Sequence, residues 1–120
     1  MKKYLLTCVV LFSGCVSNYQ STTFYVKNNA NKPINFKASV EKLSSMGPFV
    51  VTQPFTVLPQ DSVLARYVKL RKDAPPTAWF TEFIIFPVDS VRLNDPKNAD
   101  NWVKTIDAKG KPVYTFNLAK

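Results

Sequence analysis

Histidine is absent from the chain, which has 120 residues. Histidine is the usual general base near neutral pH, a common zinc ligand and a member of Ser-His-Asp and Cys-His arrangements. Glycine is also scarce, because its three residues stand far apart at positions 14, 47 and 110, and they form no glycine-rich phosphate loop. These absences exclude most of the common routes to enzymatic catalysis.

Carboxylates are the remaining candidates for acid-base chemistry, and they are few and scattered. Catalysis by carboxylates needs two of them on one cleft. The candidates outside the late polar loop each fall at a turn or on the polar face of an expected strand, and they are Glu41, Asp61, Glu82 and Asp89. We therefore expect no enzymatic activity and no cofactor.

A polar loop late in the chain carries side-chain oxygens of the kind that bind calcium. They belong to Asp95, Asn98, Asp100 and Asn101. Their spacing lacks the central glycine and the terminal glutamate of a calcium-binding helix-loop-helix. We therefore expect a solvated turn without a metal, in which Pro96 opens a short helical turn over residues 96–102.

The N-terminal segment has the pattern of an export signal. Lys2 and Lys3 precede an apolar run from Tyr4 to Phe12, and small residues follow it. The run is too short to span a bilayer, which takes roughly 20 apolar residues. A basic start, a short apolar stretch and small residues before the cut are typical of a cleavable signal peptide.

This segment ends in Leu11-Phe12-Ser13-Gly14-Cys15, which resembles the lipobox of bacterial lipoproteins. The resemblance implies that residues 1–14 are removed as a signal peptide and that Cys15 receives a diacylglyceryl group and an acylated amino terminus. Phe12 stands where the family usually has leucine. Val16 replaces the aspartate that favours inner-membrane retention, which implies a lipid anchor in the outer membrane, facing the periplasm. An ordinary secretory signal and a buried N-terminal strand are the alternatives.

Removal of the signal would leave 106 residues, which suits a single domain. Because Lys2 and Lys3 lie in the signal, the formal net charge would fall from +8 to +6. With Cys8 removed and Cys15 modified, stability depends on an apolar core, and nearly all of the nine Phe, five Tyr and two Trp of the whole chain lie outside the signal. The positive charge favours an acidic protein partner or lipid and lipopolysaccharide phosphates. Nucleic acid is not expected as a partner in the envelope, and a merely soluble basic surface is the alternative.

A short polar segment, residues 15–23, is expected to tether the domain close to its membrane. Residues 24–120 follow as one domain, in which apolar and polar side chains alternate with period two. The first two alternating runs, residues 24–28 and 34–40, should pair as a hairpin across the turn cluster between them.

The remaining strands are separated by turns at short intervals. Pro54 confines its strand to a sheet edge or a bulge. The run from Trp79 to Phe86 is the most apolar, and we expect a central strand covered on both faces. Residues 102–106 and 113–118 should form a final hairpin. About seven strands without a long helical pattern predict an antiparallel β-sandwich, immunoglobulin-like or similar, although a small barrel fits the same pattern.

The densest basic stretch spans residues 66–72. On a strand, Tyr67, Lys69 and Arg71 share one face, and Lys72 follows them. The opposite face would then carry Leu64, Arg66, Val68 and Leu70. Basic and aromatic side chains together suit a phosphate-rich surface or an acidic protein patch. An edge strand protected by its charges is the alternative.

Two tryptophans are further candidates for contact with a partner, because Trp is enriched at interface hot spots. Trp79 follows the loop at Pro75-Pro76, and Trp102 follows the late polar loop. Packing in the core is the alternative role for both.

These features together predict a non-catalytic envelope lipoprotein that binds another envelope protein from the periplasmic side. The chain would act as an accessory or assembly subunit, or as a blocker of an outer-membrane protein. The alternative is a module that binds a lipid, a glycan or lipopolysaccharide, which predicts an apolar or aromatic pocket of several hundred Å³.

Overall fold

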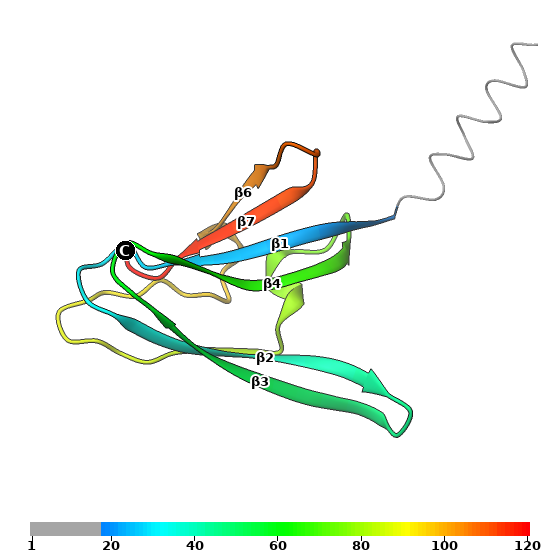
Figure 1. Ribbon diagram of the computed structural model, residues 1–120, viewed down its shortest axis with the longest axis horizontal. Coiled ribbons are helices and arrows are strands. Elements are labelled where there is room, and N and C mark those ends of the chain that lie inside the picture. The colour runs from blue at the N-terminus through cyan, green and yellow to red at the C-terminus, as the bar shows by residue number, and fades with distance from the viewer. Residues whose placement is uncertain (1–17) are drawn as a thin grey trace, which may run out of the picture.

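The computed structural model describes residues 18–120, which form a β-sandwich (Figure 1). Its strands are β1 (Tyr19–Lys27), β2 (Ile34–Ser44), β3 (Gly47–Val57), β4 (Ser62–Arg71), β5 (Glu82–Ile85), β6 (Trp102–Ile106) and β7 (Pro112–Asn117). Two 3-10 turns accompany them, η1 (Pro76–Trp79) and η2 (Ala99–Asn101). Within residues 18–120, no helix has the length and apolarity needed to cross a membrane. The all-β prediction is confirmed, whereas the expected signal peptide and Cys15 lie outside the described residues.

The strands form two separate sheets, one above the other in Figure 1. The larger sheet has the strand order β4-β1-β7-β6, and the smaller sheet has the order β3-β2-β5. β1 and β7 run parallel, whereas the other neighbouring strands are antiparallel. Because the sheets are separate, the fold is a sandwich and not the small barrel that also fitted the sequence pattern. The parallel pair makes the larger sheet mixed rather than wholly antiparallel.

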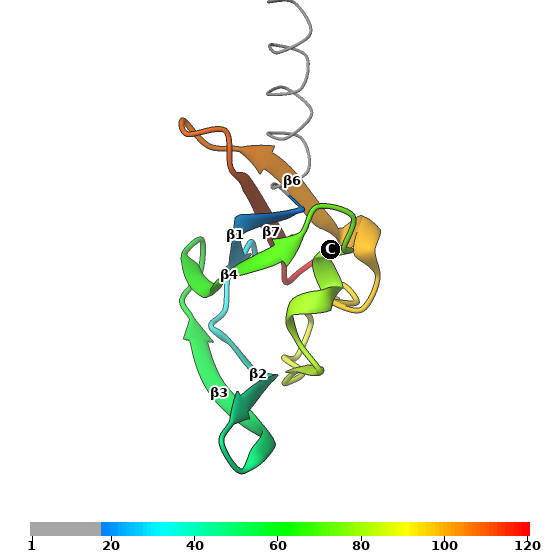
Figure 2. The ribbon, with the colours of Figure 1, turned by 90° about the vertical axis from the view of Figure 1, so that its right-hand side faces the viewer.

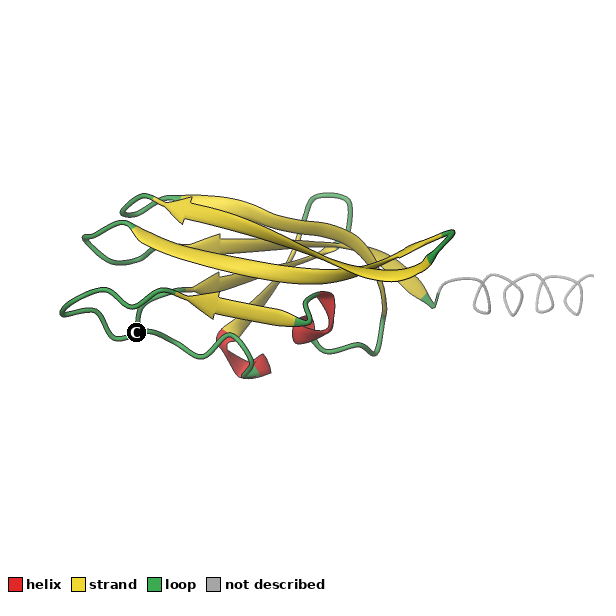
Figure 3. Cartoon of the chain, turned by 90° about the horizontal axis from the view of Figure 1, so that it is seen from below, coloured by secondary structure: helices red, strands yellow, loops and turns green. Residues whose placement is uncertain are grey.

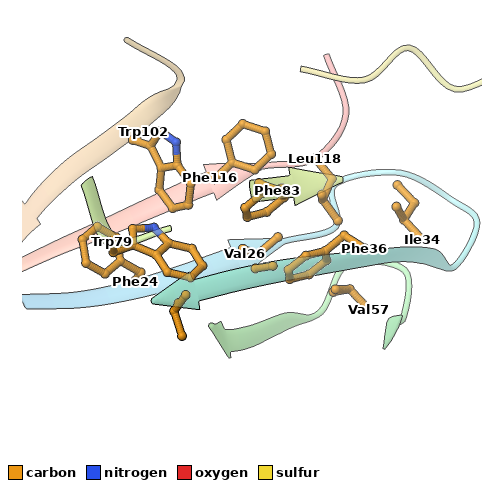
Figure 4. Close-up of a cluster of buried hydrophobic side chains, with 12 residues drawn as sticks. Phe24, Val26, Ile34, Phe36, Val57, Trp79, Phe83, Trp102, Phe116 and Leu118 are labelled. Carbon is orange, nitrogen blue, oxygen red and sulfur yellow. The ribbon is translucent and has the colours of Figure 1, made fainter. Parts of the chain in front are cut away.

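Aromatic side chains fill the space between the sheets (Figure 4). Phe24, Phe36 and Phe116 have no exposed surface. Trp79 and Trp102 join them at 6% and 4% exposure, and their rings meet edge to face with centroids 6.1 Å apart. Such pairs contribute about 0.5–1.5 kcal/mol beyond the area they bury. Both tryptophans therefore take the core-packing role, and neither offers a surface to a partner.

The first two strands do not form the hairpin that their alternation predicts. β1 belongs to the larger sheet and β2 to the smaller one, so the chain crosses between the sheets at residues 28–33. The crossing is held by Asn28, which is fully buried. Alternation determines which face of a strand is buried, but it does not select the neighbouring strand.

The apolar run from Trp79 to Phe86 is not a central strand, so this prediction is wrong. η1 ends at Trp79, and β5 has only four residues at the edge of the smaller sheet. Pro76 opens the 3-10 turn, where its fixed φ suits helical geometry. Ile84 and Phe86 are 38% and 44% exposed, so the run is covered on one face only.

The connection to the N-terminal segment is shorter than the predicted tether of residues 15–23. β1 begins at Tyr19, and its residues 19–23 pair with residues 67–71 of β4. Polar side chains do not exclude a strand here, because strand pairing depends on backbone groups. Thr22, for example, is only 2% exposed, and its hydroxyl donates to the carbonyl of Gln20 at 3.1 Å.

Asn28 is the buried polar residue at the crossing between the sheets. Its Nδ2 donates to the carbonyl oxygens of Lys32 at 2.7 Å and Val57 at 2.8 Å, and its Oδ1 accepts from the N–H of Ala30 at 2.9 Å. Its backbone N–H and carbonyl bond to the turn between β3 and β4 at 2.9 and 2.7 Å. One residue thus joins β1, the crossing turn, the end of β3 and the turn that follows it.

We expect Asn28→Ala to lower the free energy of unfolding by about 3 kcal/mol or more, because each buried group left unpaired costs about 1–3 kcal/mol. Denaturant unfolding of the purified protein measures this change. Asn31→Ala, exposed in the same turn, is the matched control and should change stability by less than about 0.5 kcal/mol. Equal stabilities of the two variants would contradict the role of the buried amide.

Candidate functional site

The outer side of β4 carries the predicted basic and aromatic side chains. Tyr67 is 64% exposed, and Lys69 and Arg71 follow it at alternate positions that are also exposed. Lys72 lies just beyond the strand, where its backbone N–H donates to the carbonyl of Asn18 at 2.9 Å. The structure therefore places the first three residues on one exposed face, as the period-two pattern predicts.

A β-bulge in β4 decides which other residues join this face. Tyr25 of β1 pairs with Leu64, and Phe24 pairs with Arg66, so Ala65 is an extra residue between them. A bulge of this kind shifts the alternation by one residue. Leu64 therefore points outward and is 53% exposed, and the prediction that placed it on the inner face is wrong.

The exposed face continues across the larger sheet, because residues paired on neighbouring strands point to the same side. One row runs from Tyr67 through Thr23 to Val113 of β7. The next row consists of Leu64, Tyr25, Thr115 and Val103. We call this surface the outer face and define it by its exposed larger side chains, which are Tyr19, Tyr25, Leu64, Tyr67, Lys69, Arg71 and Val103.

Four members of the outer face were not predicted from the sequence, namely Tyr19, Tyr25, Leu64 and Val103. Tyr25 carries a signal, because it alternates with the buried Phe24 and Val26 and so must point outward. Alternation is a property of single strands, so it does not predict that positions of β1, β4 and β6 lie side by side. Only the sheet order brings these side chains onto one surface.

The outer face carries positive charge, and none of its defining residues is a carboxylate. Lys69 and Arg71 supply the charge at the end of β4. Arg71 also pairs with Asp73 at 3.5 Å, but the two side chains are 62% and 79% exposed, and such pairs contribute about 0–1 kcal/mol. An apolar and aromatic surface with cations at one end suits a partner that offers apolar groups beside carboxylates.

β4 is also an edge strand of its sheet. Edge strands expose unpaired backbone groups, and lysines or arginines on them discourage pairing with other chains. This protective role accounts for Lys69 and Arg71. It does not account for the exposed side chains of Tyr67 and Leu64, nor for Tyr25, which stands on a strand inside the sheet. Grouped exposed apolar side chains of this kind mark interaction sites.

A hollow of about 320 Å³ lies where the crossing turn meets the last residues of the chain. Its lining is mainly polar and cationic, including Asn31, Lys32 and Arg92, and it contains no aromatic residue. A lipid- or glycan-binding module is expected to offer an apolar or aromatic pocket. This hollow does not have that character.

A smaller cavity of about 40 Å³ lies between the β2–β3 hairpin and β4, and Arg66 and Trp79 contribute to its lining. Arg66 Nε and Trp79 Nε1 are buried without a protein acceptor among the described residues. A buried donor without a partner costs about 1–3 kcal/mol. Arg66 points to the inner side of β4, as its alternation with Tyr67 predicts, and its buried unpaired donor lowers stability.

We expect Arg66→Met to leave the free energy of unfolding unchanged or to raise it by up to about 3 kcal/mol, because the change keeps the aliphatic stem and removes the unpaired donor. Denaturant unfolding measures the difference. Lys69→Met on the exposed side of the same strand is the control, with an expected change within about 0.5 kcal/mol. A marked loss of stability for Arg66→Met alone would show that the guanidinium is satisfied.

The acidic residues considered for catalysis or calcium binding form no buried pair and no metal-binding group among residues 18–120. All four candidate catalytic carboxylates are exposed and lie on different segments, and they are Glu41, Asp61, Glu82 and Asp89. In the late loop, Asp95 and Asn98 accept backbone N–H bonds from Lys97 and Asp100 at 2.9 and 3.1 Å, as in a capped turn. Residues 18–120 contain no group of three or more His, Cys, Asp or Glu placed to hold a metal ion.

Comparisons with protein-family models, curated protein sequences and solved structures gave no match to this chain. The function is therefore inferred from the exposure, charge and arrangement of the residues of this chain.

Proposed function

We propose that this protein is a non-catalytic bacterial lipoprotein that binds another protein of the cell envelope through the outer face. In this proposal Cys15 carries the lipid and holds the domain on the periplasmic side of the outer membrane. The chain then serves as an accessory or assembly subunit, or as a blocker of an outer-membrane protein. The observation that carries the proposal is an exposed sheet face that combines aromatic, aliphatic and cationic side chains without a carboxylate.

The side chains of the outer face are of the types that dominate protein interfaces. Tyr and Arg are enriched at interface hot spots, and the face presents Tyr19 and Tyr67 at 60% and 64% exposure. Leu64 and Val103 are 53% and 51% exposed and lie in the same row as Tyr25. Rigid aromatic side chains bury a large area on binding at a low cost in conformational entropy.

The charge of the outer face favours a partner with an acidic patch. Lys69 and Arg71 follow Tyr67 at alternate exposed positions toward the end of β4. The formal net charge of the processed chain, +6 after the loss of Lys2 and Lys3 from the +8 of the whole sequence, acts in the same direction at longer range. Complementary charge increases the rate of association and disfavours basic partners.

Binding of a lipid, a glycan or lipopolysaccharide is the second candidate, and the basic charge supports it. Its expected pocket has no counterpart in the hollow of about 320 Å³, which is lined mainly by polar residues. The cavity of about 40 Å³ between the sheets is too small for a lipid chain or a sugar. The outer face is the surface of a sheet, and that shape suits another protein better than a small ligand.

The start of β1 supports a domain held close to its membrane. Residues 16–18 alone separate Cys15 from Tyr19, the first residue of β1. Four steps of extended chain span at most about 13–14 Å. A connection of this length keeps the outer face at high effective concentration near other membrane proteins, so that modest affinity suffices.

We expect Cys15→Ser to move the protein from the membrane fraction to the soluble fraction, because the lipid is lost. Its unfolding transition should stay unchanged, since the substitution precedes β1. Membrane fractionation and the mass of the purified chain measure the two forms. Cys8→Ser, which leaves the lipobox intact, is the control and should remain in the membrane. A Cys15→Ser chain that fractionates like the unaltered protein would reject the anchor.

A photo-crosslinking amino acid at Tyr67, Tyr25 or Val103 tests the outer face in cells. We expect all three positions to capture the same envelope protein in a fixed ratio, because they lie in neighbouring rows of one surface. Thr56, exposed on the smaller sheet, is the control position and should capture none of it. Mass spectrometry of the crosslinked products identifies the captured protein.

Charge reversal provides the second arm of the crosslinking experiment. Lys69→Glu together with Arg71→Glu should reduce capture from position 25 by roughly tenfold, because both cations then repel an acidic patch. Capture of different abundant proteins at each position, or equal capture from position 56, would reject a dedicated partner on this face.

A further inference from the structure

The end of the β2–β3 hairpin projects from the sandwich (Figure 1), and several of its apolar side chains are exposed. Leu43 and Met46 are 83% and 97% exposed, and Phe49 is 44% exposed. The last four residues of β2 are all exposed, whereas most of its residues from Ile34 to Val40 are buried. We call residues 42–49 the hairpin tip.

The hairpin tip is a defined turn. The hydroxyl of Ser44 donates to the carbonyl of Gly47 at 2.8 Å and accepts from the N–H of Met46 at 3.2 Å. Gly47 has a φ of 111°, in a region that favours glycine. The tip contains Leu43, Met46 and Phe49, one lysine and no carboxylate. The sequence thus builds a turn that holds an apolar side chain at its extreme end.

The hairpin tip lies at the same end of the sandwich as the start of β1 (Figures 1 and 3). β2 begins after the crossing at residues 28–33, where β1 has just ended, so it runs back toward the start of β1. Figure 2 looks onto this end and shows the tip on one side and the β6–β7 turn on the other.

Cations gather around the same end of the sandwich. They are Lys42, Arg71, Lys72, Lys109 and Lys111. The carboxylates at this end are Glu41, Asp73 and Asp107, so the five cations outnumber them. Asp73 pairs with Arg71 at 3.5 Å, and Asp107 accepts the backbone N–H bonds of Lys109 and Lys111 at 2.9 and 2.8 Å. This end of the domain is therefore both apolar at the hairpin tip and positively charged around it.

We propose that this end of the domain rests on the phospholipid surface, with Leu43 and Met46 among the lipids and the surrounding cations against the phosphate groups. The orientation rests on the proposed anchor at Cys15, because the chain enters β1 at the same end. Apolar side chains backed by cations are typical of segments that lie in the membrane interface, with the apolar part buried about 5–10 Å. Contacts spread around one end of a domain also suit a plane better than a protein pocket.

This position relative to the membrane determines the direction of the outer face. The strands of the larger sheet run from the membrane end toward the turn that holds Asn28. The outer face is therefore roughly perpendicular to the bilayer, and its side chains project parallel to the membrane surface. A protein bound to it would stand beside the domain on the same membrane.

A fluorophore on the hairpin tip tests the proposal in the lipidated protein. Met46→Cys supplies the one unmodified thiol of the processed chain, and Asp89→Cys supplies the control thiol at the opposite pole, where Lys32 bonds to the Asp89 carbonyl. In vesicles that contain phosphatidylglycerol, we expect a polarity-sensitive dye at residue 46 to shift to shorter wavelength. Aqueous iodide should quench it several-fold less than the dye at residue 89. Equal quenching at the two positions would overturn the proposal.

Vesicle binding by the unlipidated chain separates the hairpin tip from the anchor. We expect Leu43→Ser with Met46→Ser to weaken binding of the Cys15→Ser chain roughly tenfold, because two apolar side chains leave the membrane interface. Leu58→Ser, at an exposed position of the turn between β3 and β4, is the control and should leave binding unchanged. Equal binding by the tip variant and its parent would count against the proposal. Where the unlipidated chain binds too weakly to measure, the quenching comparison decides.

The two proposals fail in different ways. An unmodified Cys15 in the mass of the purified chain rejects the lipid anchor, whereas vesicle binding that depends on Leu43 and Met46 still supports the hairpin tip. A lipidated chain whose tip is fully accessible to iodide rejects the membrane contact and leaves the anchor intact.

Discussion

The buried amide of Asn28 holds the crossing on which the two-sheet arrangement depends. The chain must leave β1 and enter the other sheet without stranding buried backbone groups, and this side chain bonds to Lys32 and Val57 carbonyls on either side of the crossing. Buried polar groups are costly when unpaired, so few other residues fit this position. The sheets are therefore joined firmly at one pole. At the other pole the β2–β3 hairpin extends past the aromatic core and ends in an exposed turn.

Alternation predicted the buried faces because the period of two is a property of strand geometry. Phe24 and Val26 are buried as expected, and so are Ile34 and Phe36. The same pattern assigned β1 and β2 to one hairpin, because it contains no information on long-range partners; the hydrogen bonds of Asn28 supply that information. High hydrophobicity alone does not determine a central position, because the run at residues 79–86 forms the end of a 3-10 turn and a short edge strand.

The sequence predicted the part of the candidate site that lies on a single strand, and it did not predict the residues that other strands contribute. Tyr67, Lys69 and Arg71 stand at alternate positions of one strand, so their common face follows from the sequence. The bulge at Ala65 has no such signature, and it exposes Leu64, whereas Arg66 keeps the inward position that alternation predicts. The remaining members come from β1 and β6, and only the order of strands in the sheet places them beside β4.

β1 relates the outer face to the hairpin tip. It starts at the end where the proposed anchor enters, and its outward side chains form a central row of the outer face. The direction of that face is therefore coupled to the point of attachment. With a short connection to the membrane, a surface of a few tyrosines and cations needs only modest affinity for a protein that shares the membrane. A binding task of this kind requires neither a deep pocket nor reactive groups, and it is compatible with a chain that has no histidine.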